Sequence, residues 1–457
     1  MSPTKTSERT NGSGTPNNKM ETAIYWFRND LRLDDNPALV SACQSASQII
    51  FVYCHIQHPD TRWDTPRSSG HRQFFLASAL ADLRQQLRVY GSELLEVTQS
   101  AVSCLPELAF AFNTRTIFCE EIAAPEEQDE INVLRSHGLI LNTTWQSSLL
   151  APAALPFTAD ALPEVFTVFR HAVENAGVIP PAPVRRPHLL PPLPEKFHQI
   201  AQIWKRTEQH VDANKNVPGA GCHFDPRSSF PYYQPAFGGG STAANAHLQQ
   251  YFQRGLAHTY KQTRNQLTGH DYSTKFSPWL ASGALSARQI YTALKQFEAD
   301  YGANDSSYWI WFELLWRDFF RLLHLKYGRK LYTAHGLSEL PVPSHYQENF
   351  HRWCQARTGE SLVDAGMAEL SATGTLSNRL RQIVASFLIY DLQCDWRAGA
   401  AWFEAQLIDY DVYSNQGNWL YIAGRGSDPR NGRRFNIQKQ VKDHDSDGSY
   451  QRLWTTN

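Results

Sequence analysis

Hydroxyl and ammonium groups gather directly before Pro278, at Ser273, Thr274, Lys275 and Ser277. Proline is favoured in the first turn of a helix, so this spacing predicts that a helix begins here. Exposed backbone N–H groups at a helix N-terminus, together with hydroxyls and a cation, suit a phosphate or pyrophosphate. The alternative is an ordinary polar helix cap without a ligand.

A second group of side chains that could do chemistry lies in residues 308–323. Its members share helical spacing at i, i+3, i+4 and i+7, and they are Glu313, Trp316, Arg317 and Phe320. An acid, a base and two aromatic rings therefore occupy one helical face. A charged pair on an otherwise apolar helix is costly unless it meets a partner or a ligand, so this face predicts a binding site. The alternative is an amphipathic helix in which Glu313 pairs with Arg317.

Two later segments, 373–388 and 406–426, add amide, guanidinium and carboxylate groups that can converge on one ligand. The first contributes Asn378, Arg381 and Gln382, and the second contributes Asp409, Asp411 and Asn415. In the second segment, Gly417 is expected to permit a tight turn before Trp419.

Residues 425–442 hold six basic residues against one acidic residue. A solvated basic loop is the ordinary explanation of such a run. The aromatic residues Tyr413, Trp419 and Tyr421 precede it, however, and bases stack on aromatic rings while phosphates attract cations. The combination favours the edge of a nucleic-acid surface.

The chain is 457 residues long, which is too long for one ordinary hydrophobic core, so we expect two domains to position these residues. From residue 21, short apolar runs alternate with helical stretches such as 70–90. The predicted strands are 23–27, 49–54, 93–97, 116–119 and 139–143. This alternation predicts a five-stranded, doubly wound parallel sheet. The loop after the first strand, RNDLRLDDNPAL (28–39), lacks the GxGxxG turn, so a Rossmann dinucleotide site is disfavoured.

The rest of the chain divides into a connector and a helical half. Ten prolines fall between Pro152 and Pro194, interrupted by helical patches at 163–176 and 195–213. We therefore expect a tail at 1–20, an α/β domain at 21–150, a connector across the domain surface at 151–240 and a helical domain at 241–457.

The bulk composition excludes several classes of protein. A net charge of −1 provides no global field toward DNA, so any such contact needs a local basic face. The seven cysteines are scattered without CxxC or Cys/His clusters, which favours a reducing compartment and argues against a metal site. No apolar run is long enough to span a membrane. Residues 1–20 lack the apolar core of a secretory signal, so we expect a disordered tail on a cytoplasmic protein.

Three long motifs resemble the cryptochrome and photolyase family, and its DASH group most of all. They are DYSTKFSPWLA (271–281), WFELLWRDFF (311–320) and LIDYDVYSNQGNW (407–419). The loop RNDLRLDDNPAL resembles the family's first-domain signature, and the likeness covers nearly all of 21–457. The resemblance implies an α/β antenna domain and a helical domain that binds FAD in a U-shape. It also implies blue-light-driven repair of cyclobutane pyrimidine dimers by electron transfer from the reduced flavin.

The resemblance implies which side chains hold the FAD. The hydroxyl and lysine segment would meet the pyrophosphate, Asn415 would face the flavin N5, and Arg381 would pair with Asp409. The full expected set is Tyr260, Ser273, Thr274, Lys275, Phe276, Ser277, Arg317, Asn378, Arg381, Asp409, Asp411 and Asn415.

A dimer flipped out of the DNA would lie over the flavin. Glu313 would hydrogen-bond the pyrimidine edge as a catalytic residue, with Trp316 and Tyr421 stacking on the dimer. The expected substrate contacts are Glu313, Trp316, Asn378, Gln382, Tyr421, Arg433 and Arg434. The likeness implies a preference for single-stranded or looped-out lesions, for which flipping requires little unpairing.

The family's electron relay to the flavin is matched in two of its three positions, by Trp396 and Trp419. The third position is a departure, because Ser344 follows the Val-Pro pair where relatives carry tryptophan. Tyr346 or Trp353 could replace it, or reduction could depend on an external donor.

Two further expectations come from the resemblance. An antenna chromophore, often 5,10-methenyltetrahydrofolate in this group, would lie between the domains beside Glu121. Thr375 is a second departure, because relatives usually carry an aromatic ring there.

Three functions stay open: a photolyase for dimers in single-stranded DNA, a blue-light photoreceptor without repair, and a nucleic-acid-binding regulator. Signalling relatives often change the residue at the Asn415 position, so the asparagine favours repair. We expect a monomer.

Overall fold

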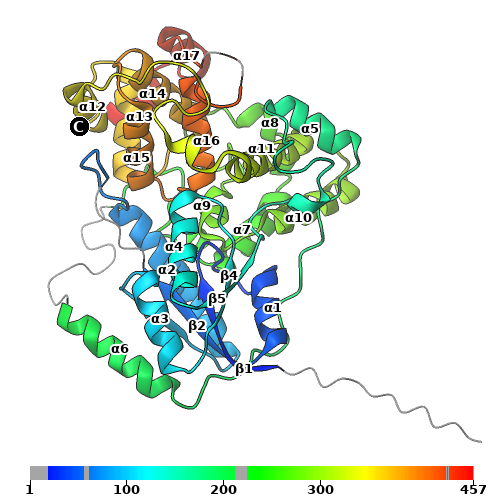
Figure 1. The fold of residues 1–457 in the computed structure, drawn as a ribbon. Coiled ribbons are helices and arrows are strands. Elements are labelled where there is room, and N and C mark those ends of the chain that lie inside the picture. Colours follow the sequence, from blue (N-terminus) through cyan, green and yellow to red (C-terminus); the bar gives the residue numbers. More distant parts are fainter. Residues whose placement is uncertain (1–18, 56–60, 212–223, 429, 431, 456–457) are drawn as a thin grey trace, which may run out of the picture.

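The five predicted strands are present in the computed structural model, which describes residues 19–55, 61–211, 224–428, 430 and 432–455. They are β1 (Met20–Phe27), β2 (Ala46–Cys54), β3 (Leu94–Val97), β4 (Thr116–Glu120) and β5 (Ile140–Thr144). All neighbours pair in parallel in the order β3-β2-β1-β4-β5, which confirms the predicted sheet (Figure 1). Residues 1–18 of the expected tail and Cys222 lie outside the described residues.

Helices cover both faces of the sheet, which explains why its central strands are continuous apolar runs. Ile24 and Trp26 of β1 pack with α3 (Ala101–Ala111) and α4 (Pro125–Ser136). Tyr25 and Phe27 point to the opposite face, toward α1 (Pro37–Ser45) and α2 (Gly70–Val89). The alternating side chains of a strand thus supply two separate cores.

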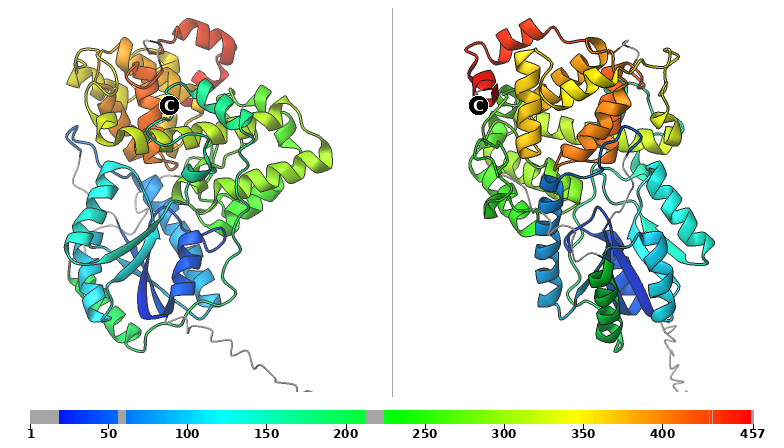
Figure 2. Two further views of the ribbon diagram at one scale, coloured as in Figure 1. Left: turned by 45° about the vertical axis from the view of Figure 1, so that its right-hand side comes forward. Right: turned by 90° about the vertical axis from the view of Figure 1, so that its left-hand side faces the viewer.

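The second half is helical, as predicted, and lies above the carboxyl edge of the sheet (Figures 1 and 2). Its helices are α7 (Ser241–Gln253), α8 (Tyr260–Thr263), α9 (Ser277–Ser282), α10 (Ala287–Tyr301), α11 (Asp305–Tyr327), α12 (Gln347–Cys354), α13 (Ser361–Thr373), α14 (Asn378–Tyr390), α15 (Trp396–Gln406), α16 (Val412–Ala423), α17 (Ile437–His444) and α18 (Ser449–Thr455). Short 3-10 turns occur at Pro152–Ala154, Pro235–Phe237, Leu256–His258 and Gly328–Tyr332. Within the described ranges, no helix is both long and apolar enough to cross a membrane.

The connector contains two helices that belong to different cores. Phe166 and Phe169 of α5 (Phe166–Asn175) are buried in the core of the helical domain. Phe197 of α6 (Phe197–Val211) is buried against the sheet, with Ala201 one turn later. The connector therefore adds apolar packing to both halves of the molecule.

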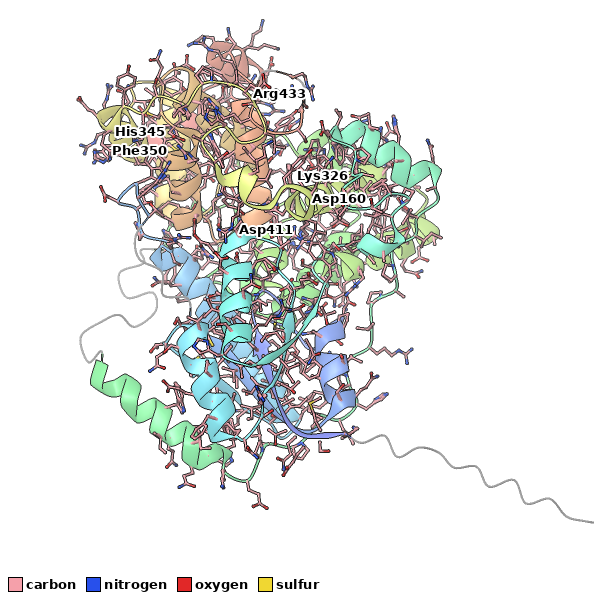
Figure 3. All side chains as sticks on the ribbon, in the orientation of Figure 1. Asp160, Lys326, His345, Phe350, Asp411 and Arg433 are labelled. Atoms are coloured by element: carbon pink, nitrogen blue, oxygen red, sulfur yellow. The ribbon has the colours of Figure 1, made fainter. Side chains whose placement is uncertain are left out.

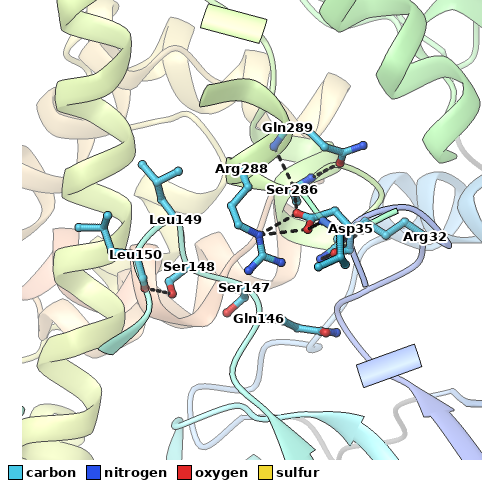
Figure 4. Close-up of polar contacts among 12 residues, drawn as sticks. Arg32, Asp35, Gln146, Ser147, Ser148, Leu149, Leu150, Ser286, Arg288 and Gln289 are labelled. Atoms are coloured by element: carbon cyan, nitrogen blue, oxygen red, sulfur yellow. Dashed lines mark hydrogen bonds and ion pairs between the residues drawn. The ribbon is translucent and has the colours of Figure 1, made fainter. Parts of the chain in front are cut away.

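The loop 28–39, which lacks a glycine turn, fastens the two halves together (Figure 4). Asp35 is fully buried and accepts hydrogen bonds from Ser286 Oγ at 2.5 Å and Arg288 Nε at 2.9 Å. Arg32 donates to the carbonyl of Gly283 at 2.8 Å. Gly283 has φ +70° and lies so close to the loop that a Cβ would come within 1.8 Å of the Asn29 carbonyl oxygen. The first loop thus positions the helical domain on the sheet.

The predicted tight turn at Gly417 is wrong. Gly417 lies inside α16, and an added Cβ would come within 2.1 Å of the Phe320 ring on α11. The residue is small because two helices pack closely there, so its role is in packing and not in backbone conformation.

Candidate functional site

A cavity of about 300 Å³ opens in the helical domain and gathers residues from all four motif segments. Of the expected cofactor set, it is lined by Tyr260, Ser273, Thr274, Lys275, Phe276, Ser277, Arg317, Asn378, Arg381 and Asp409. Glu313 lines the same cavity. Chain segments more than a hundred residues apart therefore meet around one space whose volume suits a small-molecule ligand.

The hydroxyl and lysine segment faces this cavity and does not cap a helix. The helix α9 does begin at Ser277, but no side chain caps it, so the polar-cap alternative is wrong. Lys275 is 8% exposed, has a left-handed backbone with φ 57°, and its Nζ lies 3.5 Å from the centre of the Tyr272 ring. Burial lowers the pKa of Lys275 to about 7. Burial disfavours the charged form of this lysine, and an anionic ligand in the cavity would restore it.

Arg317 is the second cation at the cavity. Its guanidinium donates to the carbonyl oxygens of Ser147 and, at 3.3 Å, of Leu280. Burial and the nearby charge of Arg321 lower the pKa of Arg317 to about 10. Among the residues that the structure describes, neither Lys275 nor Arg317 forms a salt bridge. Two cations without carboxylate partners fit a pyrophosphate-containing cofactor such as FAD.

The alternative pairing of Glu313 with Arg317 is wrong. Glu313 instead forms a salt bridge with Arg264, which also lines the cavity. Sequence reasoning misses Arg264, although its place four residues after Tyr260, in the segment that begins at residue 258, was a usable signal. The Glu313 carboxylate is thus held at the cavity wall by a partner from another helix.

Arg381 and Asp409 form the expected pair, with Nη2 of Arg381 at 2.9 Å from the carboxylate. Thr375, the second expected departure from the family pattern, is buried and lines the same cavity. Its hydroxyl lies 2.9 Å from that of Thr373, which is buried behind it.

A smaller adjoining cavity of about 70 Å³ holds the remaining cofactor residues. It is lined by Asp411, Asn415, Gln382 and Trp419 together with the shared residues Asn378, Arg381 and Asp409. Although burial would raise the pKa of Asp411, Arg321 at 2.5 Å and Arg317 hold it at about 2. The amide of Asn415 donates to the carbonyl of Ala400 at 3.0 Å.

The expected stacking residues Trp316 and Tyr421 line neither of these cavities but a third space, which shares Phe320 with the larger one. Trp316, one turn after Glu313, stacks on Phe166 at 3.7 Å between ring centroids and lies 5.9 Å from Tyr421. Arg433 donates a hydrogen bond to the Tyr421 hydroxyl. Arg434 pairs instead with Asp391 at 2.6 Å and is exposed. Figure 3 shows Arg433 on the upper surface of the helical domain, away from the sheet.

The two expected relay tryptophans are buried on neighbouring helices. Trp396 begins α15 and Trp419 lies on α16, where it lines the smaller cavity. Of the two candidate replacements, Trp353 is fully buried with its ring 6.5 Å from that of Trp419. Tyr346 is 53% exposed. Ser344 is exposed as well.

Glu121 lies at the carboxyl end of β4 and is partly buried. Its backbone N–H donates to Thr144 at 2.9 Å, whereas its side chain lines neither of the two cavities described above. The preceding residue, Glu120, is more deeply buried, and burial with the charge of Asp30 raises its pKa to about 8.

Known proteins resemble this chain over nearly its whole length. A family model described as DNA photolyase matches residues 23–188, and one described as the FAD binding domain of DNA photolyase matches residues 309–457. A Xenopus laevis protein named cryptochrome DASH is 42% identical, over 94% of this chain and 82% of its own.

Two solved structures share the fold. The cryptochrome of Synechocystis sp. PCC6803 aligns with a TM-score of 0.85 at 39% identity, covering 95% of this chain and 89% of its own. A class III photolyase of Agrobacterium tumefaciens aligns with a TM-score of 0.77 at 27% identity, covering 95% and 86%. The chain therefore belongs to the cryptochrome and photolyase family, in its cryptochrome DASH group, and carries that family's FAD-binding domain.

Proposed function

We propose that this protein is a light-driven, FAD-dependent photolyase that repairs cyclobutane pyrimidine dimers and prefers single-stranded or looped DNA. The observation that carries the proposal is the continuity of three features. Glu313 lines the larger cavity together with two cations, Lys275 and Arg317, that form no salt bridge with any described residue. That cavity shares Phe320 with the space lined by Trp316 and Tyr421, and the Tyr421 hydroxyl accepts a hydrogen bond from Arg433. The cofactor would thus bind in the cavity, the lesion against the aromatic residues and the DNA backbone at the arginine, all in neighbouring parts of one domain.

The residues at the cavity fit FAD. Lys275 and the hydroxyls beside it would hold the pyrophosphate, and Arg381, fixed by Asp409, would line the flavin. Asn415 would contribute its amide, which can donate to or accept from a ring nitrogen. When bound and reduced, the flavin supplies the light-driven electron that splits the dimer.

Side chains beside the cavity would bind and orient the dimer. Trp316 already stacks on Phe166, so its ring plane is fixed before the lesion arrives. Glu313 is oriented by Arg264 and would offer its carboxyl group to the pyrimidine edge. Such preorganised polar groups are most effective in a site that excludes water. Asn378 and Gln382 would add polar contacts from α14.

The DNA strand would follow the exposed Arg430 and Arg434 and the partly buried Arg433. Since the chain is nearly neutral overall, this local face would supply the electrostatic part of binding. Flipping a base from single-stranded DNA costs less than from a duplex, because no base pair is broken. We further propose a cytoplasmic monomer and a folate antenna near Glu121.

The proposal is tested with flavin-loaded, chemically reduced protein and three oligonucleotides that carry one thymine dimer: single-stranded, looped-out and duplex. We expect blue light to restore intact thymines in the first two, and more slowly or not at all in the third. If no substrate is repaired although reduced flavin is bound, the protein is better described as a photoreceptor. Binding that ignores both light and lesion would indicate a nucleic-acid-binding regulator.

A further inference from the structure

The loop 61–69, which precedes α2 in the α/β domain, brings a tryptophan to the position where the expected relay is incomplete. The ring of Trp63 lies 4.7 Å from the ring of His345, the residue directly after Ser344. The loop is held against α15 at both ends of that helix. Arg62 lies 3.9 Å from Asp395 at the helix start, and Ser69 N–H donates to the Ala405 carbonyl at 2.7 Å.

A continuous series of ring contacts joins Trp63 to the smaller cavity. From Trp419, the centroid distances are 6.5 Å to Trp353, 6.2 Å from Trp353 to Phe350, and 5.5 Å from Phe350 to His345. Figure 3 shows His345 and Phe350 together at one edge of the helical domain. The last step, from His345 to Trp63, reaches a partly exposed indole.

A second connection leads from Trp396 to the same place. The backbone N–H of Asp395, the residue before Trp396, donates to Nδ1 of His345 at 3.4 Å. The rings from Trp353 onward and the backbone beside Trp396 thus both reach His345, which contacts Trp63. Phenylalanine and imidazole rings are much harder to oxidise than indole, so within this series of contacting rings Trp63 is the member at the outer end that can give up an electron.

We propose that Trp63 is the solvent-side electron donor of the route that reduces the bound flavin, in place of the tryptophan missing at Ser344. The inference rests on the proposed function, because it requires FAD in the cavity. One electron leaves the Trp63 indole and refills the tryptophan that has been oxidised nearer the cavity, and the indole N–H proton passes to solvent. An external thiol then returns a hydrogen atom to Trp63, and two thiyl radicals combine to a disulfide.

A positive charge, that of Arg62, lies beside the Trp63 ring and affects how easily the ring is oxidised. The Arg62 guanidinium lies 4.3 Å from the ring centre, and a cation over an indole face disfavours removal of an electron. Asp395 offsets that charge in part. Replacing Arg62 by glutamine is therefore expected to make Trp63 easier to oxidise and to raise its yield as the radical.

The test uses flavin-loaded protein with oxidised flavin, blue light and a thiol, and compares Trp63→Phe and Trp63→Tyr with wild type. Trp311→Phe is the matched control, because Trp311 of α11 is also partly buried but packs against Tyr291 of α10. We expect Trp63→Phe to lose most of the long-lived tryptophan radical and of the flavin bleaching. Trp63→Tyr, which keeps an oxidisable ring, should retain part of both, and the control should match wild type.

A second readout does not depend on flavin reduction rates. After illumination in air without thiol, peptide mass spectrometry should find oxidised tryptophan at position 63 in wild type and not in Trp419→Phe. Radical lifetime and bleaching in Trp63→Phe equal to wild type, or oxidation confined to other tryptophans, would overturn the inference. Dimer repair by chemically reduced Trp63→Phe should equal wild type, so a failure of repair in both would count against the proposed function and not against Trp63.

Discussion

FAD binding should depend on pH through Lys275. Burial lowers the pKa of this lysine from the ordinary 10.5 to about 7, which makes the charged form unfavourable by roughly 5 kcal/mol in the empty cavity. Between these two values the unfolded chain binds more protons than the folded one, so the destabilisation that this group causes in the flavin-free fold decreases as pH rises from about 7. A pyrophosphate beside the amine would reverse the shift and restore the proton.

Binding of FAD should therefore take up protons. With a pKa of about 7, roughly nine-tenths of the flavin-free molecules carry neutral Lys275 at pH 8 and roughly one-tenth at pH 6. We expect an uptake of about 0.9 proton at pH 8 and about 0.1 at pH 6 from this residue.

Titration calorimetry in two buffers of different ionisation enthalpy counts these protons directly. Lys275→Met should bind FAD more weakly and lose most of the uptake at pH 8. The substitution is a fair comparison, because both side chains carry a Cβ at the left-handed φ of 57°. Lys261→Met, which removes a partly exposed lysine that pairs with Asp305, is the control and should behave as wild type. Equal uptake in Lys275→Met and wild type would refute the reasoning.

Four other predictions follow from the site. Glu313→Ala should retain FAD but lower the repair rate by about one to two orders of magnitude, the scale of losing one transition-state partner; an unchanged rate would remove Glu313 from the chemistry. Trp419→Phe should block photoreduction of oxidised flavin and spare repair by chemically reduced protein, and persisting photoreduction would place the route elsewhere. Neutralising Arg433 and Arg434 together should weaken DNA binding and flatten its salt dependence, whereas an unaltered slope would exclude this edge. Gly417→Ala should lower the melting temperature, because the new methyl group would overlap a ring of α11; an unchanged melting temperature would show that the helices can separate there.

The sheet could be predicted from the sequence because its central strands β1, β2 and β4 are largely buried on both faces and so read as apolar runs. The helical half was also predictable in kind, and Glu313, Lys275 and Asn378 do meet at one cavity as expected. What could not be predicted were contacts across long sequence separations. Helical spacing suggested that Glu313 would pair with Arg317 within α11. In the structure, Arg317 donates to backbone carbonyl oxygens, and Glu313 forms its salt bridge with Arg264.

The packing role of Gly417 and the contact between Trp63 and His345 could not be predicted from the sequence either. A glycine can mean a turn or a close helix contact, and the sequence around Gly417 does not distinguish the two. The loop that carries Trp63 lies more than two hundred and eighty residues from His345 in the chain, so no local pattern relates them. The missing tryptophan at Ser344 was visible in the sequence, whereas its replacement required the fold.

We propose that the flavin cavity and the side chains of Glu313, Trp316 and Tyr421 form one light-driven repair site. The decisive experiment illuminates reduced, flavin-loaded protein with a single-stranded oligonucleotide that holds one thymine dimer, beside an identical sample kept in the dark. We expect intact thymines to reappear only in the illuminated sample, and Glu313→Ala to lower their rate of appearance. Equal recovery in light and dark, or none with the reduced flavin demonstrably bound, would contradict it.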